Sequence, residues 1–454
     1  MIKLKNKKIG LIGLGISNLH LANYLINNTD KVFITEELPK EKIETQISKL
    51  DPRVEYECGG HTEKILTCDL VIRSPGIPRD NFLLKQIINK GIPVFTEIEL
   101  AYQILKQKIK KEPIILAVTG TNGKTTTVSL LGNICKNYKK TVVCGNIGEP
   151  FIKFVDDIDE ETIIVIEVSS YQLEDIIEFK PHIGCILNIT EDHLEHHKSM
   201  QNYIDAKFNL FKNQDNKDFA VLNYDDENIK KSVNKIKKSN ILFFSTKTFI
   251  NNGAWLDKKN SKVVINSNFD NSHIKIETTL LGEHNLENIA AAVCCSRLLN
   301  IPIYIIEDTI RNFKGVEHRL EFVRKINNVV FINDSKSTNV DSTFVALKSF
   351  VQPIHLILGG RDKGAPYTPL IPLIEQKVKT ILLIGEATEV IYNQLKNINL
   401  PIYKCETLEN AVKKAYEIAK PGDIVLLSPA CSSFDQFKNF EHRGKVFKQL
   451  VNSL

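Results

Sequence analysis

The sequence predicts an α/β protein of three domains, each built on a mostly parallel sheet. Short apolar runs of strand length alternate with helical patterns along the chain, and glycine or polar residues follow the ends of those runs. Its 454 residues correspond to about three domains of ordinary size. Ligands bind such sheets at the carboxyl ends of the strands. We expect domains at residues 1–97, 98–315 and 316–454.

Composition and charge exclude several classes of protein. The apolar fraction of 43%, the charged fraction of 25% and the net charge of +5 are those of a globular protein without a nucleic-acid partner. No apolar run reaches the length of a membrane span. The nine cysteines are scattered and form no C-x-x-C pair, which indicates thiols in a reducing, cytoplasmic compartment.

The first domain begins with a strand, a Gly-Leu-Gly turn at residues 13–15 and a helical pattern. This resembles the first unit of a Rossmann-like domain, in which the turn receives a phosphate. Asn18 replaces the third glycine, so a plain turn without a ligand remains an alternative. The next strand, at residues 31–35, ends at two glutamates, where an acidic residue can hold a ribose hydroxyl. A third strand ends at residues 73–78, which we expect beside the glycine turn.

The second domain opens with an apolar run at residues 114–118, a glycine-containing loop and a helical pattern at residues 128–136. In this arrangement the backbone N–H groups of the loop can surround a phosphate. The lysine of the loop, Lys124, can reach the outer oxygens of that phosphate, and a hydroxyl can hold magnesium. The general pattern has a glycine where this chain has Val118. The alternative to a nucleotide site is a strand-to-helix turn whose lysine is merely solvated. The predicted nucleotide-binding residues are Gly120, Thr121, Asn122, Gly123, Lys124, Thr125 and Thr126.

Two further positions of this domain suggest metal chemistry. Glu167 lies inside an apolar strand, where a carboxylate is costly unless it is paired or faces a cation. Magnesium near the phosphates would supply that cation, and an ordinary lysine is the alternative. His193 follows the next strand beside Asp192, which makes it a candidate functional residue. After Ile241, short alternating runs predict a small antiparallel patch.

The third domain again places polar residues at strand ends. Apolar runs at residues 329–333, 354–358, 380–384 and 423–427 are followed by charged and hydroxyl residues. Such residues at the carboxyl edge of a sheet suit an anionic substrate.

Together these motifs make the chain similar, over nearly its whole length, to the Mur ligases of peptidoglycan synthesis. The phosphate loop has that family's form, which includes the absent glycine at position 118. Further shared signatures lie at residues 167–170, 284–285, 317–319 and 334–336. Sister members and folylpolyglutamate synthetase share them. Residues 74–77, 169–174 and above all 427–440 resemble the D-glutamate-adding branch of the family.

The resemblance implies a Rossmann-like first domain, a central P-loop ATPase-like domain and a Rossmann-like third domain. It implies a cytoplasmic, monomeric ligase that uses ATP to join D-glutamate to UDP-N-acetylmuramoyl-L-alanine through an acyl phosphate. Two magnesium ions would neutralise the converging anionic oxygens. A sister ligase, a folylpolyglutamate synthetase-like ligase and a non-catalytic nucleotide-binding protein remain alternatives. The interpretation as a dehydrogenase would rest on Gly13 and Gly15 alone.

The resemblance also implies roles for single residues. The catalytic group comprises Lys124, His193, Lys207 and Asn146. The metal ligands comprise Thr125 and Glu167 for one magnesium, and His193 and a carbamylated Lys207 for the other. ATP would also contact Asn285, Arg319, Asp334 and Lys336. The UDP substrate would contact Ile16, Ser17, Thr35, Ser74 and Asn146. D-glutamate would contact Thr338, Lys363, Ser433 and Phe440.

Overall fold

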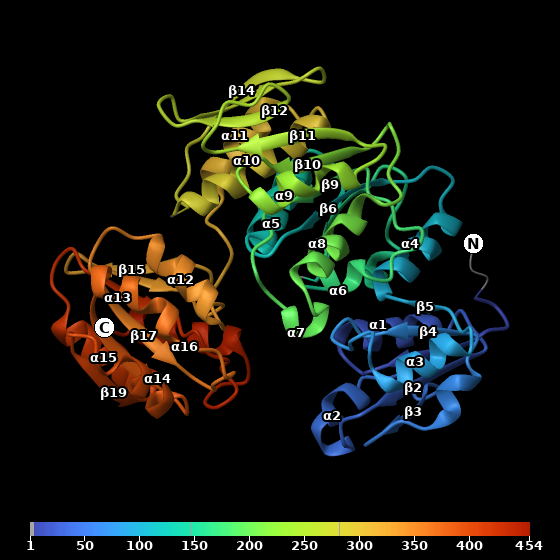
Figure 1. The fold of residues 1–454 in the computed structure, drawn as a ribbon, viewed down its shortest axis with the longest axis horizontal. Coiled ribbons are helices and arrows are strands. Elements are labelled where there is room, and N and C mark those ends of the chain that lie inside the picture. The colour runs from blue at the N-terminus through green and yellow to red at the C-terminus, as the bar shows by residue number, and fades with distance from the viewer. Residues whose placement is uncertain (1–3, 147, 281) are drawn as a thin grey trace. The chain divides into compact units, whose positions relative to one another are not determined.

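A computed structural model of the chain describes residues 4–146, 148–280 and 282–454. In these residues the strands form three sheets, and most neighbouring strands are parallel (Figure 1). The predicted α/β class is therefore confirmed.

The chain forms two compact units, Met1–Glu277 with Leu286–Asn312 and Thr278–Asn285 with Phe313–Leu454. Among the described residues, no helix is long and apolar enough to cross a membrane.

The first sheet has the order β3-β2-β1-β4-β5, and all of its pairs are parallel. Its strands are β1 (Lys8–Ile12), β2 (Lys31–Glu36), β3 (Glu55–Cys58), β4 (Leu70–Arg73) and β5 (Val94–Phe95). The connections contain α1 (Ile16–Leu25), α2 (Lys40–Ile47), the 3-10 turn η1 (Glu63–Thr67) and α3 (Phe82–Asn89). Apolar side chains fill β1 and β4 because parallel strands are covered on both faces. The ends of β2, β1 and β4 consequently lie side by side.

The central sheet has the order β14-β13-β12-β11-β10-β9-β6-β8-β7. Its parallel strands are β6 (Ile114–Thr119), β7 (Thr141–Gly145), β8 (Ile163–Glu167), β9 (Ile183–Ile186), β10 (Phe219–Asn223) and β11 (Asn240–Ser245). They are followed by β12 (Gly253–Asp257), β13 (Lys262–Asn266) and β14 (Asn271–Lys275). The predicted antiparallel patch exists as β12–β14, but β11 and β12 pair in parallel. The loops after β6, β8 and β9 are neighbours at the carboxyl edge.

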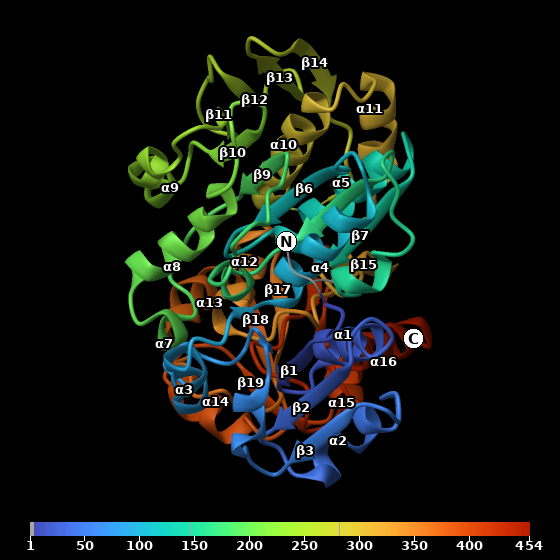
Figure 2. The same ribbon diagram turned by 90° about the vertical axis from the view of Figure 1, so that its right-hand side faces the viewer.

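Helices and short turns cover the central sheet. They are α4 (Glu97–Lys108), α5 (Lys124–Lys136), η2 (Phe151–Phe154), α6 (Ser170–Leu173), α7 (Leu194–His197), α8 (Met200–Phe208), η3 (Asn209–Phe211), α9 (Glu227–Ser232), η4 (Val233–Lys235), α10 (Glu283–Leu298) and α11 (Ile303–Asn312). Helix α11 packs against α5, and both can be followed in Figure 2.

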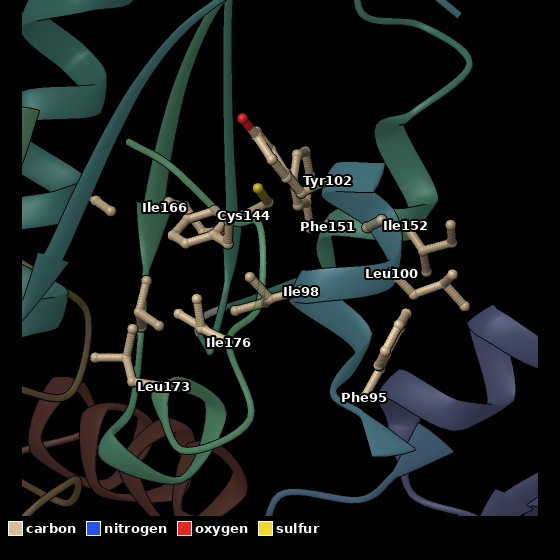
Figure 3. Close-up of a cluster of buried hydrophobic side chains, with 14 of the residues drawn as sticks. Phe95, Ile98, Leu100, Tyr102, Cys144, Phe151, Ile152, Ile166, Leu173 and Ile176 are labelled. Atoms are coloured by element: carbon tan, nitrogen blue, oxygen red, sulfur yellow. The ribbon is translucent and has the colours of Figure 1, made fainter. Parts of the chain in front are cut away.

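One hydrophobic core joins the first sheet to the central sheet. Figure 3 shows Phe95 of β5, Ile98 and Leu100 of α4, and Phe151 and Ile152 of η2 as members of one buried cluster. Each of these side chains is nearly or completely buried. Because α4 contributes to this shared core, the first sheet and the central sheet belong to one compact unit.

The third sheet, in the second unit, has the order β15-β16-β20-β17-β18-β19. Its strands are β15 (Glu321–Ile326), β16 (Val329–Asn333), β17 (Ile354–Gly359), β18 (Val378–Ile384), β19 (Ile402–Glu406) and β20 (Ile424–Leu427). Its helices and turns are α12 (Val340–Lys348), η5 (Thr368–Leu370), α13 (Ile371–Lys377), α14 (Thr388–Leu395), α15 (Leu408–Ile418) and α16 (Phe440–Asn452). Among the described strands of this third sheet, only the β15–β16 pair is antiparallel. Two hydrophobic clusters, one rich in α12–α14 residues and one in α15–α16 residues, pack against this sheet.

Candidate active site

The phosphate loop connects β6 to α5 and depends on two glycines. Gly123 is the N-cap of α5 and has a positive φ of 84°, and a Cβ there would collide with the side chain of Asn288. A Cβ on Gly120 would lie 3.0 Å from the Cβ of Leu187. Val118 is buried within β6, opposite Glu167 of β8. The position that is glycine in the general pattern therefore belongs to the strand here.

Asn188, the second residue after β9, holds this loop, and sequence analysis missed it. Its side-chain carbonyl accepts the Asn122 N–H at 2.8 Å, and its amide donates to the Asn122 carbonyl at 3.1 Å. The Asn188 backbone carbonyl accepts the Thr121 N–H at 2.9 Å. The Thr121 hydroxyl also lies 3.1 Å from that of Tyr203. The loop is thus fixed from the neighbouring strand end.

The amino groups of two lysines meet at one carbonyl of the loop. Lys124 donates to the carbonyls of Gly120 at 2.9 Å and Thr121 at 2.8 Å, and Lys207 donates to the Gly120 carbonyl at 2.9 Å. Lys207 is 1% exposed, and its Nζ lies 4.5 Å from the centroid of the Tyr203 ring. Burial and then the charge of Lys124 hold the pKa of Lys207 well below its usual range. This shift favours the neutral form of the amine, which is nucleophilic.

Glu167, the last residue of β8, has one oxygen prepared for a cation. Its Oε1 accepts the Asn146 side-chain amide at 3.0 Å. Its Oε2 is buried and has no hydrogen-bond partner in the described part of the chain. A buried carboxylate oxygen without a partner is costly, so the site fits a divalent cation. Thr125, in the first turn of α5, is half-buried.

His193 lies in the turn between β9 and α7, with φ of 55°. Its Nε2 is 3.3 Å from Oδ2 of Asp192. The pKa of His193 is lowered by burial, and the charges of Lys124 and Lys207 act in the same direction. A neutral imidazole is the form that ligates metals. The structure therefore brings the three side chains Lys124, Lys207 and His193 together around the phosphate loop.

The predicted residues of the first sheet follow the adjacent ends of β1, β2 and β4. The Ile12 carbonyl accepts the Ser74 N–H at 3.0 Å, and the Thr35 carbonyl accepts the Gly13 N–H at 2.9 Å. Thr35 is buried, and its hydroxyl lies 2.7 Å from Glu57 and from His61. Ile16 is 65% exposed and Ser17 is half-buried.

Asn18 closes the glycine turn of the first sheet. Its amide donates to the carbonyls of Ile12 at 3.0 Å and Gly13 at 2.8 Å, and to the Ser74 hydroxyl at 3.1 Å. Glu36 accepts the Leu14 N–H at 2.6 Å. The third glycine of the motif is therefore replaced by a side chain that binds the turn.

In the second unit, Asp334 follows β16 and is completely buried. It accepts hydrogen bonds from Ser337 at 2.5 Å and Ser428 at 2.8 Å. Burial raises the pKa of Asp334, and the charge of Arg319 opposes that shift. Arg319 also acts on His284, whose pKa is lowered to about 4, first by burial and then by that charge. Asn285, the next residue, is buried too. These residues gather at one edge of the sheet.

Three of the predicted D-glutamate residues lie on loops that follow neighbouring strands, and the fourth, Phe440, is the first residue of α16. Thr338 donates its N–H to the Lys336 carbonyl at 2.9 Å, and Lys336 lies 5.9 Å from the Phe440 ring centroid. Ser433 is buried in the segment after β20. Lys363 follows β17, and its pKa is lowered by burial and by the charge of Arg443.

Arg443 of α16 is a second residue that sequence analysis missed. It is completely buried and donates to the carbonyls of Ser335 at 2.9 Å, Cys431 at 3.2 Å and Ser432 at 3.3 Å. The segments after β16 and β20 are thereby tied together. The sequence could have signalled this only through an arginine on the buried face of an amphipathic helix.

Comparison with known proteins identifies the family. The chain matches the MurD N-terminal domain over residues 8–82, the Mur ligase middle domain over 118–296 and the Mur ligase glutamate ligase domain over 318–431. It is 41% identical to the UDP-N-acetylmuramoylalanine–D-glutamate ligase of Clostridioides difficile, over 99% of both chains. The chain belongs to the Mur ligase family. A ligase of the same name from Caldicellulosiruptor bescii is 43% identical over 99% of this Mur ligase and 98% of that protein.

Solved structures agree with this Mur ligase fold. The UDP-N-acetylmuramate–alanine ligase MurC of Thermotoga maritima has a TM-score of 0.60 and 18% identity over 99% of this chain and 100% of its own. MurF of Thermotoga maritima, solved in complex with ADP, has a TM-score of 0.60 and 17% identity over 93% and 95%. Mur ligases are ATP-using enzymes that form amide bonds.

Proposed function

We propose that this Mur ligase joins D-glutamate to UDP-N-acetylmuramoyl-L-alanine at the expense of ATP, in the cytoplasmic stage of peptidoglycan synthesis. The reaction class rests on one observation, the two lysines that meet at the Gly120 carbonyl of the phosphate loop. The choice of amino acid rests on the full-length similarity to D-glutamate ligases. The protein would act as a monomer.

We assign the UDP substrate to residues 1–97, ATP to residues 98–315 and D-glutamate to residues 316–454. In the first of these, Ile16, Ser17, Thr35 and Ser74 would contact the substrate. The buried hydroxyl of Thr35 already lies 2.7 Å from Glu57 and from His61, and its carbonyl accepts the Gly13 N–H, so a ligand at Thr35 would have to share these groups. Ile16 offers an exposed apolar side chain for a base to cover.

Amide formation proceeds in two steps. The substrate carboxylate attacks the γ-phosphorus of ATP, ADP leaves, and an acyl phosphate forms. The amine of D-glutamate then attacks the carbonyl carbon, and phosphate leaves the tetrahedral intermediate. Lys124 and the loop N–H groups of residues 120–126 would hold the phosphates and offset their charge. Asn146, fixed by Glu167, would orient the substrate near the reacting carboxylate.

Thr125 and Glu167 would hold one magnesium ion, and His193 and Lys207 a second. When bound, magnesium supplies positive charge that lowers the repulsion between the carboxylate and the phosphates. The unpartnered oxygen of Glu167 and the neutral imidazole of His193 fit this role. Lys207 as an ammonium does not fit, but its lowered pKa favours the neutral amine that adds carbon dioxide. The carbamate formed is an anion with two oxygens.

The second unit would supply further ligand-binding residues. Arg319 and Lys336 would bind ATP as cations, Asp334 would accept ribose hydroxyls and Asn285 would contact the adenosine. Thr338 and Ser433 would donate to the carboxylates of D-glutamate, Lys363 would offset their charge, and the ring of Phe440 would pack on the methylenes. Lys363→Ala should raise the KM for D-glutamate at least tenfold and leave that for ATP nearly unchanged. Equal effects on both constants would contradict this assignment.

A panel of amino acids tests the proposed function. ADP release is measured with UDP-N-acetylmuramoyl-L-alanine, ATP and magnesium, and with D-glutamate, L-glutamate, L-alanine, L-lysine or diaminopimelate in turn. D-glutamate should support turnover at least a hundredfold faster than any other member. Turnover with another amino acid would identify a sister ligase. Binding of ATP without turnover on any of them would identify a nucleotide-binding protein.

A further inference from the structure

A buried ion-pair network links the first sheet to the turn that carries His193. We propose that Arg73 is a positioning residue that, through Glu174, couples binding of the UDP substrate to the placement of His193. This inference rests on the function proposed above, because it needs Ser74 at the UDP substrate and His193 at the nucleotide.

Arg73 is the last residue of β4, directly before Ser74, and its side chain is completely buried. It donates to Asp175 from Nε at 2.8 Å and to Glu174 at 3.0 Å. It also donates to the backbone carbonyls of Ile77 and, at 3.2 Å, Tyr171. One guanidinium therefore binds its own loop and the segment around α6. The loop of Ser74 cannot shift without disturbing that segment.

Glu174 continues the network to α7. Its Oε1 lies 3.0 Å from Nε2 of His196 and 3.1 Å from Nδ1 of His197. Burial would raise the pKa of Glu174, but hydrogen bonds from both histidines and the charge of Arg73 lower it to about 2. The carboxylate is therefore ionised at neutral pH. It joins the guanidinium to both imidazoles.

Helix α7 is a single turn that begins directly after His193. Residues with positive φ, His193 and Lys198, lie at its two ends, so few helical bonds hold it. The Tyr171 ring packs against His193 and against His196, with centroids 5.0 and 4.3 Å apart. The position of His193 thus depends on the side chains that Glu174 and Tyr171 contact. A displacement at Ser74 would therefore reach His193 through Glu174 and Tyr171.

A metal ion is the rival occupant of this cluster. One ligand atom each from Glu174, His196 and His197 lies within 4.8 Å of the others. The groups are, however, already satisfied, because Arg73 pairs with the second oxygen of Glu174 and Ser170 lies 2.9 Å from Nε2 of His197. The ion-pair network accounts for these contacts without a metal.

Isothermal titration calorimetry tests the proposal. The Kd of UDP-N-acetylmuramoyl-L-alanine is measured with and without magnesium and ADP, a pair that binds without turnover. The ratio of the two values measures the coupling. We expect a ratio of at least about five in the wild type. Arg73→Met should bring it close to one. Arg79→Met is the matched control, because Arg79 pairs with the same Asp175 at 2.7 Å but is 59% exposed, and it should keep the wild-type ratio.

Glu174→Gln is the second variant, since it leaves the pair of Arg73 and Asp175 intact and guards against a folding defect in Arg73→Met. It should also lose the coupling while its thermal unfolding midpoint stays near the wild-type value. A wild-type ratio of one, or wild-type coupling in Glu174→Gln, would overturn the proposal. Coupling that appears only after zinc is added, and is removed by a chelator, would overturn it in favour of the metal site. A wild type that binds no UDP substrate would instead reject the proposed function.

Discussion

Two turns of this molecule share one plan, a parallel strand, a glycine turn and a helix, and differ in charge. In the turn between β1 and α1, the Leu14 N–H donates to the carboxylate of Glu36 at 2.6 Å. In the turn between β6 and α5, Lys124 and Lys207 both donate to the Gly120 carbonyl at 2.9 Å. The first turn receives a carboxylate from the chain, and the second receives the amino groups of two lysines.

This difference decides what each turn can bind. A carboxylate at the N–H of Leu14 occupies the place where a dinucleotide fold would hold a phosphate. A diphosphate in the first sheet must therefore bind at following residues such as Ile16 and Ser17. The cationic turn suits a polyphosphate. The glycines alone do not show which turn binds a polyphosphate, whereas the charged groups that reach each turn do.

The largest expected effect is at the cationic turn. Lys124→Met should lower the rate of phosphate release by about 1,000-fold or more, because an ammonium group at the transferred phosphate is lost. The KM for D-glutamate should change little. Lys136→Met, at the exposed end of the same helix, is the control and should keep full activity. A loss below tenfold in Lys124→Met would mean that the turn does not bind the reacting phosphates.

Lys207→Ala should lower activity by roughly 10²–10³-fold. The lost group is a negatively charged ligand if the lysine is carbamylated, so short carboxylic acids such as acetate should restore part of the activity. Rates are compared at several acid concentrations for the variant and the wild type. A variant that responds to acetate no more than the wild type does would argue against the carbamate.

Helix α4, which connects the last strand of the first sheet to β6, supplies a pH dependence. Glu97, at the start of α4, is buried, has one oxygen without a partner in the described residues, and has its pKa raised to about 7 by burial. The folded state therefore keeps a proton that the unfolded chain loses above about pH 4.3. The stabilisation of the folded state by this retained proton is complete below that pH and is lost as pH rises through about 7. The total is on the order of 3 kcal/mol.

Glu97→Gln keeps an acceptor for the Ile152 N–H, which Glu97 binds at 2.6 Å, and removes the titration. The free energy of unfolding of the wild type, relative to the variant, should fall between pH 5 and pH 8. Urea unfolding at both pH values measures this difference. Parallel pH profiles for the two proteins would show that Glu97 does not titrate in this range.

The smallest effect is expected at the first turn. Asn18→Ala removes three hydrogen bonds, to Ile12, Gly13 and Ser74. It should cost about 1–3 kcal/mol of stability and raise the KM for the UDP substrate about tenfold, with little change for ATP. Asn23→Ala is the control: this half-buried asparagine binds the segment of Lys49 and Asp51 in the same domain, and its loss should leave both constants unchanged. Equal changes for ATP and the UDP substrate would mean that the two turns do not act separately.

The strands and their ends could be predicted from the sequence, because apolar runs and the residues after them are local signals. Glu167 and the phosphate loop were found in this way. The parallel pairing of β11 with β12 could not be predicted, because apolar residues alternate in the same way in parallel and antiparallel strands. The pattern identified the strand and left its direction open.

The supporting residues could not be predicted, because their partners are distant in the chain. Arg73 pairs with Asp175, about 100 residues away, and Arg443 binds Ser335 over a similar separation. Neither arginine belongs to a motif. Asn188 follows a strand end as many asparagines do, and only the fold brings it to the phosphate loop. Sequence patterns therefore indicate which groups react, and tertiary contacts show what holds them.

The central claim is that the cationic turn transfers the γ-phosphoryl group of ATP to the substrate carboxylate. The most direct measurement uses UDP-N-acetylmuramoyl-L-alanine labelled with ¹⁸O in both carboxylate oxygens, together with ATP, magnesium and D-glutamate. Mass spectrometry of the released phosphate should find one ¹⁸O atom in each molecule, because the bridging oxygen of the acyl phosphate leaves with the phosphorus. Phosphate without ¹⁸O would contradict the account.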